Sequence, residues 1–382
     1  MTTVRHIHRR EVDRSGLIST NVNPEQFDLR WAAWAAAVET LQIDLVASGW
    51  MNLFAALLMP APTTELRWSG SGPGANAEVK RAYSALMGRF FGRAILRRDH
   101  GCRWLRQVFD GLELAPGVYL RRRAGQEGDL PDWVGWDDIN GCWVVAEAKG
   151  SHDQSGWTVG IPPPLRTALR QLDRIEIVDG SGPIAFKNWA VACRWGTELN
   201  GRSPVIITCD PDNEGRQLED WEVAQHREEA RARWTADLLE GLGRPDMAAA
   251  ARTGDAASSK SMEDDLVLIP GRSGYAALAI EAGGILPLVG SGRAERAASI
   301  VTTARILKRG MALVLLDRVA AESAVLRAGQ NDRLDRDSAG RRVSGATATD
   351  INALEQAELT IDGVTFRTIL DDIEFPDTPP PP

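Results

Sequence analysis

The sequence predicts an α/β protein, because helical and strand patterns alternate along its first half. Residues 76–98 place apolar side chains three and four positions apart, which is typical of an amphipathic helix. Residues 131–149 contain two apolar runs around a polar turn, which predicts a β-hairpin. A second helix is expected over residues 165–175, and two further strands over 189–193 and 205–209.

The first of these helices has the signals of a defined start. Asn76 is a residue type favoured at the N-cap. Glu78 lies in the first turn, where a carboxylate interacts favourably with the helix dipole. Residues 117–120 come next among the apolar segments, and we expect them to form the first strand of the sheet.

The hairpin carries the residues that are most informative about function. Asp132 opens the first apolar run, and Glu147 and Lys149 close the second. Because strand side chains alternate, Glu147 and Lys149 point to one face and Ala148 points into the core. Pairing of the two runs brings Asp132 beside Glu147. Two hard carboxylates with an ammonium beside them predict a site for Mg²⁺ or Mn²⁺.

Asp132, Glu147 and Lys149 resemble the motif of the PD-(D/E)XK nuclease superfamily. The resemblance covers roughly residues 76–210, about a third of the chain. It implies a restriction-endonuclease-like fold, a mixed sheet flanked by helices in the order α-β-β-β-α-β. It also implies that Asp132 and Glu147 bind the metal, with the Ala148 carbonyl assisting, and that Lys149 is catalytic. The activity expected from it is Mg²⁺-dependent hydrolysis of DNA phosphodiester bonds. We expect an endonuclease, although the sequence does not distinguish endonuclease from exonuclease action.

The resemblance draws attention to two other positions. Many nucleases of this superfamily have a helical Glu before the hairpin that helps to bind metal, so Glu78 is either such a ligand or only a first-turn acid. Some have a Gln on the helix after the Lys, followed four residues later by Tyr. Gln171 matches the Gln, but Ile175 stands at the Tyr position. We therefore expect Gln171 at the surface rather than in the site.

Local charge favours DNA as the partner. Residues 76–123 contain eleven Lys or Arg and four acids. These positions include three arginines on one helical face and a run of three near the site: Arg89, Arg93 and Arg97, then Arg121, Arg122 and Arg123. They can neutralise phosphates, or they form a solvated arginine surface. The net charge of −8 excludes a general polyanion binder.

A chain of 382 residues predicts more than one domain. All thirteen Trp lie at or before Trp234, which marks a change in composition. The divisions that we expect are an N-terminal helical region over 1–62, a nuclease-like domain over 63–235, a helix end and linker over 236–265, a separate C-terminal α/β domain over 266–376, and a Pro-rich tail over 377–382. The C-terminal domain is expected to serve target recognition, homo-oligomerisation or docking of a partner protein.

Cysteine usage and hydropathy define the cellular setting that we expect. The four cysteines form no CxxC pair, which argues against a zinc site and a disulfide framework. The sequence shows no signal peptide, so a reducing cytoplasm is expected. The longest apolar stretch, residues 31–62, is interrupted by Glu39 and Asp44, so no membrane span is predicted.

The function predicted from the sequence is therefore that of a metal-dependent deoxyribonuclease. By analogy, restriction, defence against phage or DNA processing are the settings that fit such a nuclease joined to a second module. Two alternatives stay open. One is a non-catalytic DNA-binding or assembly protein on a degenerate nuclease fold, and the other is a ribonuclease with the same chemistry.

Overall fold

The computed structural model describes residues 4–20, 24–40, 46–58, 64–74, 76–152, 157, 160–211, 216–241 and 245–253. Beyond residue 253 it describes only strands, at 267–268, 275–281, 284–285, 311–317, 358–361 and 364–368. The chain divides into two compact units. The first comprises residues 1–39 and 50–231, and the second comprises 40–49 and 232–382.

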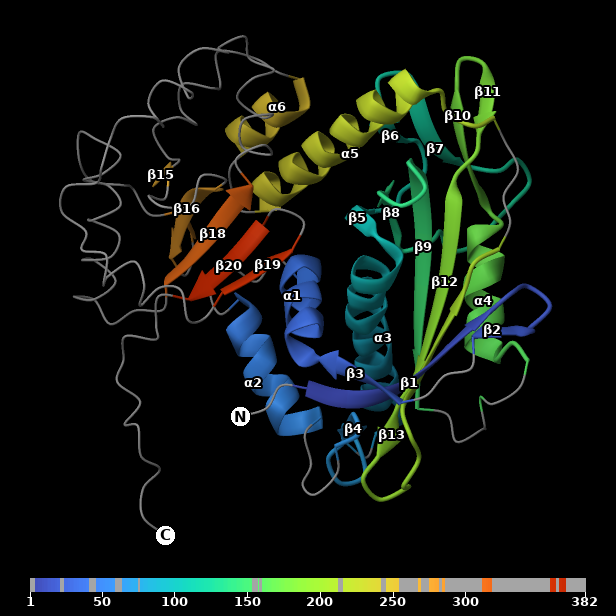
Figure 1. The fold of residues 1–382 in the computed structure, drawn as a ribbon, viewed down its shortest axis with the longest axis vertical. Helices are drawn as coiled ribbons and strands as arrows, with labels where there is room; N and C mark the ends of the chain where they lie inside the picture. Colours follow the sequence, from blue (N-terminus) through green and yellow to red (C-terminus); the bar gives the residue numbers. More distant parts are fainter. Residues whose placement is uncertain are drawn as a thin grey trace, which may run out of the picture. The chain divides into compact units, whose positions relative to one another are not determined.

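The first unit is built on a mixed sheet of eight strands, so the predicted α/β class is confirmed (Figure 1). Its strands run in the order β2-β1-β14-β12-β9-β8-β5, and β3 pairs with β1. The pairs β1 with β14 and β9 with β12 are parallel, and the other pairs are antiparallel. The strand bounds are β1 Val4–Val12, β2 Ile18–Thr20, β3 Pro24–Asp28, β5 Cys102–Gln107, β8 Trp133–Asp137, β9 Cys142–Ser151, β12 Lys187–Arg194 and β14 Val205–Cys209.

Two helices cover the centre of this sheet. Helix α3 (Ala77–His100) and helix α4 (Pro163–Leu172) both pack on β9 and β12, and Figure 1 shows them on opposite faces of these strands. The side chain of Asn76 accepts a hydrogen bond from the backbone N–H of Glu78 at 2.7 Å, which confirms the predicted N-cap. Gly101 ends α3 in the left-handed conformation, with φ 65°.

The predicted first strand, residues 117–120, lies in a different sheet. It belongs to β7 (Val118–Arg122), which pairs with β6 (Leu112–Ala115) and β10 (Ile175–Asp179), and β10 pairs in turn with β11 (Gly182–Ile184). The strand that enters the main sheet is β5, directly after α3. Its alternation is hidden in the sequence because the pairing with β8 shifts register between Arg103 and Arg106, where Trp104 has φ 50°.

The N-terminal segment contributes both strands and helices. Helices α1 (Leu29–Thr40) and α2 (Val46–Leu58) lie where helices were expected, but β1 and β3 join the main sheet. Aromatic side chains attach this segment to α3. Phe27 stacks on Phe91 with ring centroids 5.1 Å apart, and Trp50 packs edge-on against Phe90 at 5.0 Å.

Trp side chains fill the core around the hairpin. Trp133, Trp136 and Trp143 are each at most 2% exposed. Trp136 and Trp143 are paired across β8 and β9 and meet edge to face, with centroids 5.4 Å apart. This packing holds the hairpin that ends at Asp132 and Glu147 firmly in one register.

The remaining described elements are two short strands, two helices and the strands of the second unit. Strands β4 (Arg67–Trp68) and β13 (Gly196–Thr197) pair in parallel, and α5 (Asp220–Gly241) and α6 (Pro245–Thr253) follow. In the second unit, β15 (Val267–Leu268), β16 (Tyr275–Glu281), β17 (Gly284–Ile285), β18 (Met311–Asp317), β19 (Glu358–Ile361) and β20 (Val364–Thr368) pair antiparallel. The separate C-terminal domain stays a prediction, since the segments between these strands, and the Pro-rich tail, lie outside the described residues.

Candidate active site

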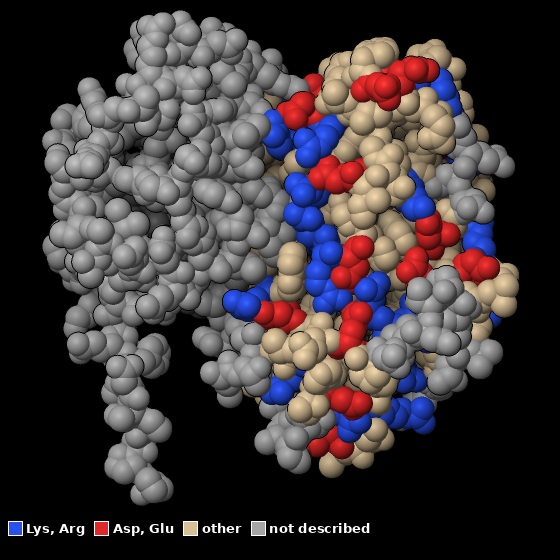
Figure 2. Space-filling model, in the orientation of Figure 1, with Lys and Arg blue, Asp and Glu red and all other residues tan. Residues whose placement is uncertain are grey.

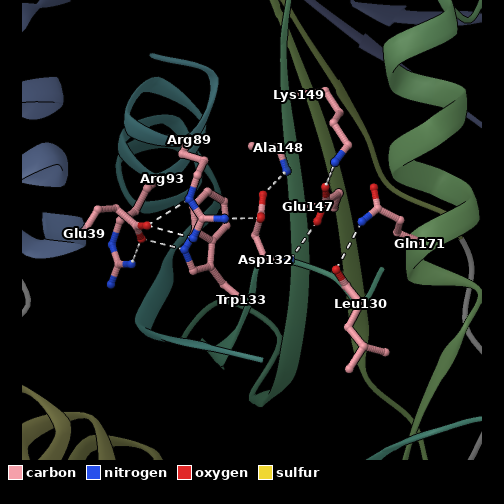
Figure 3. A network of polar contacts seen from close by, with 10 residues as sticks. All are labelled: Glu39, Arg89, Arg93, Leu130, Asp132, Trp133, Glu147, Ala148, Lys149 and Gln171. Atoms are coloured by element: carbon pink, nitrogen blue, oxygen red, sulfur yellow. Dashed lines mark hydrogen bonds and ion pairs between the residues drawn. The ribbon is translucent and has the colours of Figure 1, made fainter. Parts of the chain in front are cut away.

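Asp132 and Glu147 meet at the open end of the β8–β9 hairpin (Figure 3). Trp133 is paired with Ala146, so the residues that flank this pair lie next to each other. The backbone N–H of Asp132 donates to Glu147 Oε2 at 2.7 Å, and the backbone N–H of Ala148 donates to Asp132 Oδ2 at 3.0 Å. Each carboxylate is therefore held by the main chain of the other strand, as the hairpin predicted.

Lys149 completes the predicted trio. Its Nζ forms an ion pair with Glu147 Oε1, and its side chain is 31% exposed, whereas that of Glu147 is fully buried. The ammonium thus links a buried carboxylate to the solvent. Ala148 is buried on the other face of β9, against α3, so the alternation expected for these three residues is confirmed.

Two glycines let α3 lie directly on the strand that carries the trio. A Cβ on Gly92 would come within 2.7 Å of the Ala148 Cβ, and one on Gly88 would come within 2.4 Å of the Gly150 backbone nitrogen. No larger residue fits at either position without movement of the helix. The four-residue spacing of Gly88 and Gly92 on one helical face is a sequence signal of this contact.

Arg89 and Glu39 extend the site in a way that the sequence did not indicate. Arg89 Nη1 forms an ion pair with Asp132 Oδ1, while its Nε and Nη2 donate to Glu39 Oε2 at 3.1 and 2.8 Å. Glu39 Oε1 accepts from Trp133 Nε1 at 2.6 Å and forms an ion pair with Arg93 Nη1 (Figure 3). In the sequence, Glu39 was only a break in an apolar stretch. A single acid after the buried Ala-rich part of α1 was the available sign of a paired charge.

The three arginines of α3 do not form the exposed face that was expected, because Arg93 is buried and Arg89 and Arg97 are half-buried. Arg93 is 3% exposed, paired with Glu39, and donates from Nη2 to the Leu105 carbonyl at 2.5 Å. Arg89 is turned toward Asp132 and Glu39, and Arg97 is half-buried. For Arg89 and Arg93 the physical reason is that the buried Glu39 carboxylate needs compensating charge, which these two side chains supply.

The second arginine group lies on β7 and just beyond it. Arg121 is exposed and pairs with Glu176 at 2.8 Å. Arg122 Nη1 donates to the Gly128 carbonyl, and Arg123 Nε donates to the Ile175 carbonyl, each at 2.8 Å. On the face seen in Figure 2, Lys and Arg of the described residues form a band that is flanked by patches of Asp and Glu.

Gln171 is buried, which corrects the expectation of a surface position. It is 5% exposed and donates from Nε2 to the Leu130 carbonyl at 3.1 Å, two residues before Asp132. It lies on the sheet-facing side of α4 with Ala168 and Leu172. Figure 3 shows it on the same side of β9 as Glu147 and Lys149.

Glu78 is not brought to the carboxylate pair. It is exposed in the first turn of α3. Arg89, the residue of α3 that pairs with Asp132, follows eleven positions later, which is roughly 16 Å along a helix axis. Of the two alternatives for Glu78, its position therefore fits an acid in the first turn that interacts with the helix dipole.

Burial and mutual repulsion change the acidity of the two carboxyl groups. Burial and, to a smaller extent, the neighbouring Asp132 raise the pKa of Glu147 to about 8, against the opposing effect of Lys149. Burial also raises the pKa of Asp132, against the opposing charge of Arg89. The pair therefore binds protons more readily than two carboxyl groups in water.

The donor set suits a hard divalent cation. Among the residues that the structure describes, no cluster of three or more His, Cys, Asp or Glu could hold a metal ion. Mg²⁺, however, is commonly held by one or two carboxylates and completes its shell with waters and substrate phosphate. Asp132 and Glu147, which contact each other through the hairpin, fit this pattern. The Ala148 carbonyl stays a predicted third ligand.

Comparison of the chain with family models, curated proteins and solved structures gave no match in any of the three searches. Within the described residues, no helix is both long and apolar enough to cross a membrane.

Proposed function

We propose that the protein is a metal-dependent nuclease that hydrolyses DNA phosphodiester bonds. The observation that carries this proposal is the meeting of Asp132, Glu147 and Lys149 at one end of the β8–β9 hairpin. Asp132 lies 15 residues before Glu147 and is joined to it by strand pairing, whereas side-chain alternation along β9 puts Lys149 beside Glu147. The same trio carried the resemblance to the PD-(D/E)XK superfamily.

The order of the elements supports a restriction-endonuclease-like fold. Helix α3 is followed in the main sheet by β5, β8 and β9, then by α4 and β12. This is the order α-β-β-β-α-β that the resemblance implied. The first three strands are antiparallel neighbours, and β12 lies parallel to β9 after the crossover through α4. Strands β6, β7, β10 and β11 are insertions in this scheme.

Each residue of the site has a different proposed role in hydrolysis. Asp132 and Glu147 would hold Mg²⁺ or Mn²⁺, which supplies Lewis-acid catalysis and a water acidified for attack. Lys149, partly exposed beside Glu147, can orient the attacking water or stabilise negative charge that develops on the phosphate. Arg121, Arg122 and Arg123 are proposed to contact the DNA backbone, with an affinity that falls as salt rises. Endonuclease action in restriction, phage defence or DNA processing is the setting that we propose.

A non-catalytic role on the same fold is the second candidate. It is favoured by the ion pairs that already compensate both carboxylates, Arg89 with Asp132 and Lys149 with Glu147. In that case the charges are structural, and the protein binds DNA or assembles with a partner without cutting. Metal-dependent cleavage separates the two candidates.

The test is incubation of the full chain with linear DNA, circular DNA and single-stranded RNA, each with Mg²⁺, Mn²⁺ or EDTA. Asp132→Asn and Lys149→Met should abolish cleavage. Asp129→Asn, the same change at an exposed acid three residues away, and Lys80→Met on α3 are the matched controls and should leave it intact.

The outcomes discriminate among the candidates. Cleavage of circular DNA would identify an endonuclease, and cleavage of RNA alone would identify a ribonuclease. Cleavage that persists in Asp132→Asn would place the activity elsewhere or in a contaminant. Intact nucleic acid under every metal, with binding in a mobility-shift assay, would favour the non-catalytic role.

A further inference from the structure

The strongest unassigned feature near the site is the way in which Arg89 is shared between two carboxylates. Two of its nitrogens, Nε and Nη2, face Glu39 Oε2, and the third, Nη1, faces Asp132 Oδ1. A guanidinium is planar and can bind two acids at once in a fixed geometry, which a lysine ammonium cannot do.

Glu39 has no capacity left to act as a metal ligand. Its two oxygens receive hydrogen bonds from Arg89, Arg93 and Trp133, and its side chain is only 10% exposed. The guanidinium of Arg89 also lies over the Trp133 ring, 5.0 Å from its centroid. Glu39 and Trp133 therefore hold Arg89 in place independently of Asp132.

The Asp132 carboxylate, in contrast, has one neutral and one charged partner, and each contacts a different oxygen. Its Oδ2 accepts the Ala148 backbone N–H, and its Oδ1 faces the Arg89 cation. A divalent cation bound to Asp132 has to approach an oxygen already facing a positive charge. Two cations beside one carboxylate repel each other, and the repulsion is strong where solvent is largely excluded.

We propose that Arg89 is a positioning residue that stands in for the metal at Asp132 and competes with it. Without metal, Arg89 compensates and orients the Asp132 carboxylate. Asp132 Oδ1 would be the oxygen available to hold the cation, and Arg89 would stay on Glu39 through its other two nitrogens. Arg89 thereby weakens metal binding and keeps the site folded when it is empty of metal. This inference rests on the proposed function, because it assumes that Asp132 is a metal ligand.

The test measures Mn²⁺ binding to the full chain by the loss of the free-ion paramagnetic resonance signal, with no nucleic acid present. Arg89→Met removes the charge but keeps an aliphatic stem. We expect its Mn²⁺ Kd to fall by about tenfold relative to wild type, equivalent to about 1.4 kcal/mol for release of one charged hydrogen bond. The Mn²⁺ concentration for half-maximal DNA cleavage should fall in parallel.

Three further variants make the result specific. Arg89→Gln also removes the charge and should tighten binding, which covers the case in which Arg89→Met is unstable. Arg89→Lys keeps the charge and should change the Kd less than either neutral variant. Arg14→Met, which removes an exposed arginine paired with Asp173, should leave the Kd at the wild-type value.

Asp132→Asn separates failure of this inference from failure of the proposed function. Binding that is lost in Asp132→Asn but unchanged or weakened in folded Arg89→Met and Arg89→Gln would overturn the inference alone. Binding that is equal in wild type, Asp132→Asn and Arg89→Met, or absent from all of them, would overturn both. Thermal melts of each variant confirm that the protein assayed is folded.

Discussion

Gly88 of α3 and Gly150 of β9 are in direct backbone contact, so close that a Cβ on Gly88 would lie 2.4 Å from the Gly150 nitrogen. This contact seats the helix that carries Arg89 on the strand that carries Glu147 and Lys149. The distance between the two elements is therefore set by backbone atoms, which cannot rotate away as side chains do.

Gly88→Ala is expected to destabilise the protein by about 2 kcal/mol, because the added methyl forces α3 away from β9. Urea unfolding gives the free energy directly. Gly180→Ala is the matched control, since a Cβ at Gly180 meets nothing within 4 Å, and it should change stability by less than about 0.5 kcal/mol. Equal effects of the two substitutions would contradict the close contact.

Glu39→Gln tests the buried charge cluster. The change leaves the Arg93 guanidinium, which is 3% exposed, without its carboxylate, and it weakens the support of Arg89. We expect a loss of about 3 kcal/mol in the free energy of unfolding. Glu176→Gln, which breaks the exposed pair with Arg121, should cost at most about 1 kcal/mol. A loss for Glu39→Gln as small as the control's would mean that the cluster does not stabilise the fold.

Stability should depend on pH through Glu147. Its pKa is raised to about 8 in the folded chain from an ordinary value of 4.5. Between these values the folded state keeps a proton that the unfolded chain loses, so stability falls as pH rises through this window. Glu147→Gln removes this dependence. Melting in EDTA should show a larger advantage of the variant over wild type at pH 8 than at pH 5, and an equal difference at both pH values would refute the raised pKa.

The contribution of His100 to stability is expected to change with pH in the opposite direction to that of Glu147. Burial lowers the pKa of His100 to about 4, from 6.5, and its ring packs at a tilt against Trp189 with centroids 3.7 Å apart. As pH falls from 6.5 toward 4, the unfolded chain takes up a proton that the folded state refuses, so stability is lost. His100→Gln should reduce the slope of the melting temperature against pH over this interval. A pH profile parallel to that of wild type would show that His100 is not the cause.

Much of the site could be predicted because it depends on local rules. Asp132 and Glu147 are joined by a hairpin, and the side-chain alternation of one strand puts Lys149 beside Glu147 and Ala148 in the core. The helix over 77–100 also follows from its own periodicity and its Asn76 cap. None of these inferences needs a distant part of the chain.

The remaining features depend on contacts that cross the sequence. Polar side chains such as Arg and Gln are usually found at the surface. Here Arg89 and Arg93 point inward because they pair with Glu39, and Gln171 points inward because it donates a hydrogen bond to the Leu130 carbonyl. Strand β5 can be identified only from its pairing with β8, because a shift in register interrupts the alternation of its side chains.

The sequence by itself determined the α/β class, the hairpin and the acid-acid-lysine trio, because periodicity and turn chemistry act over a few residues. The tertiary structure decided which charges surround the trio. A buried carboxylate such as Glu39 must find compensating charge wherever packing places it, and packing brings Arg89 and Arg93 from fifty residues away.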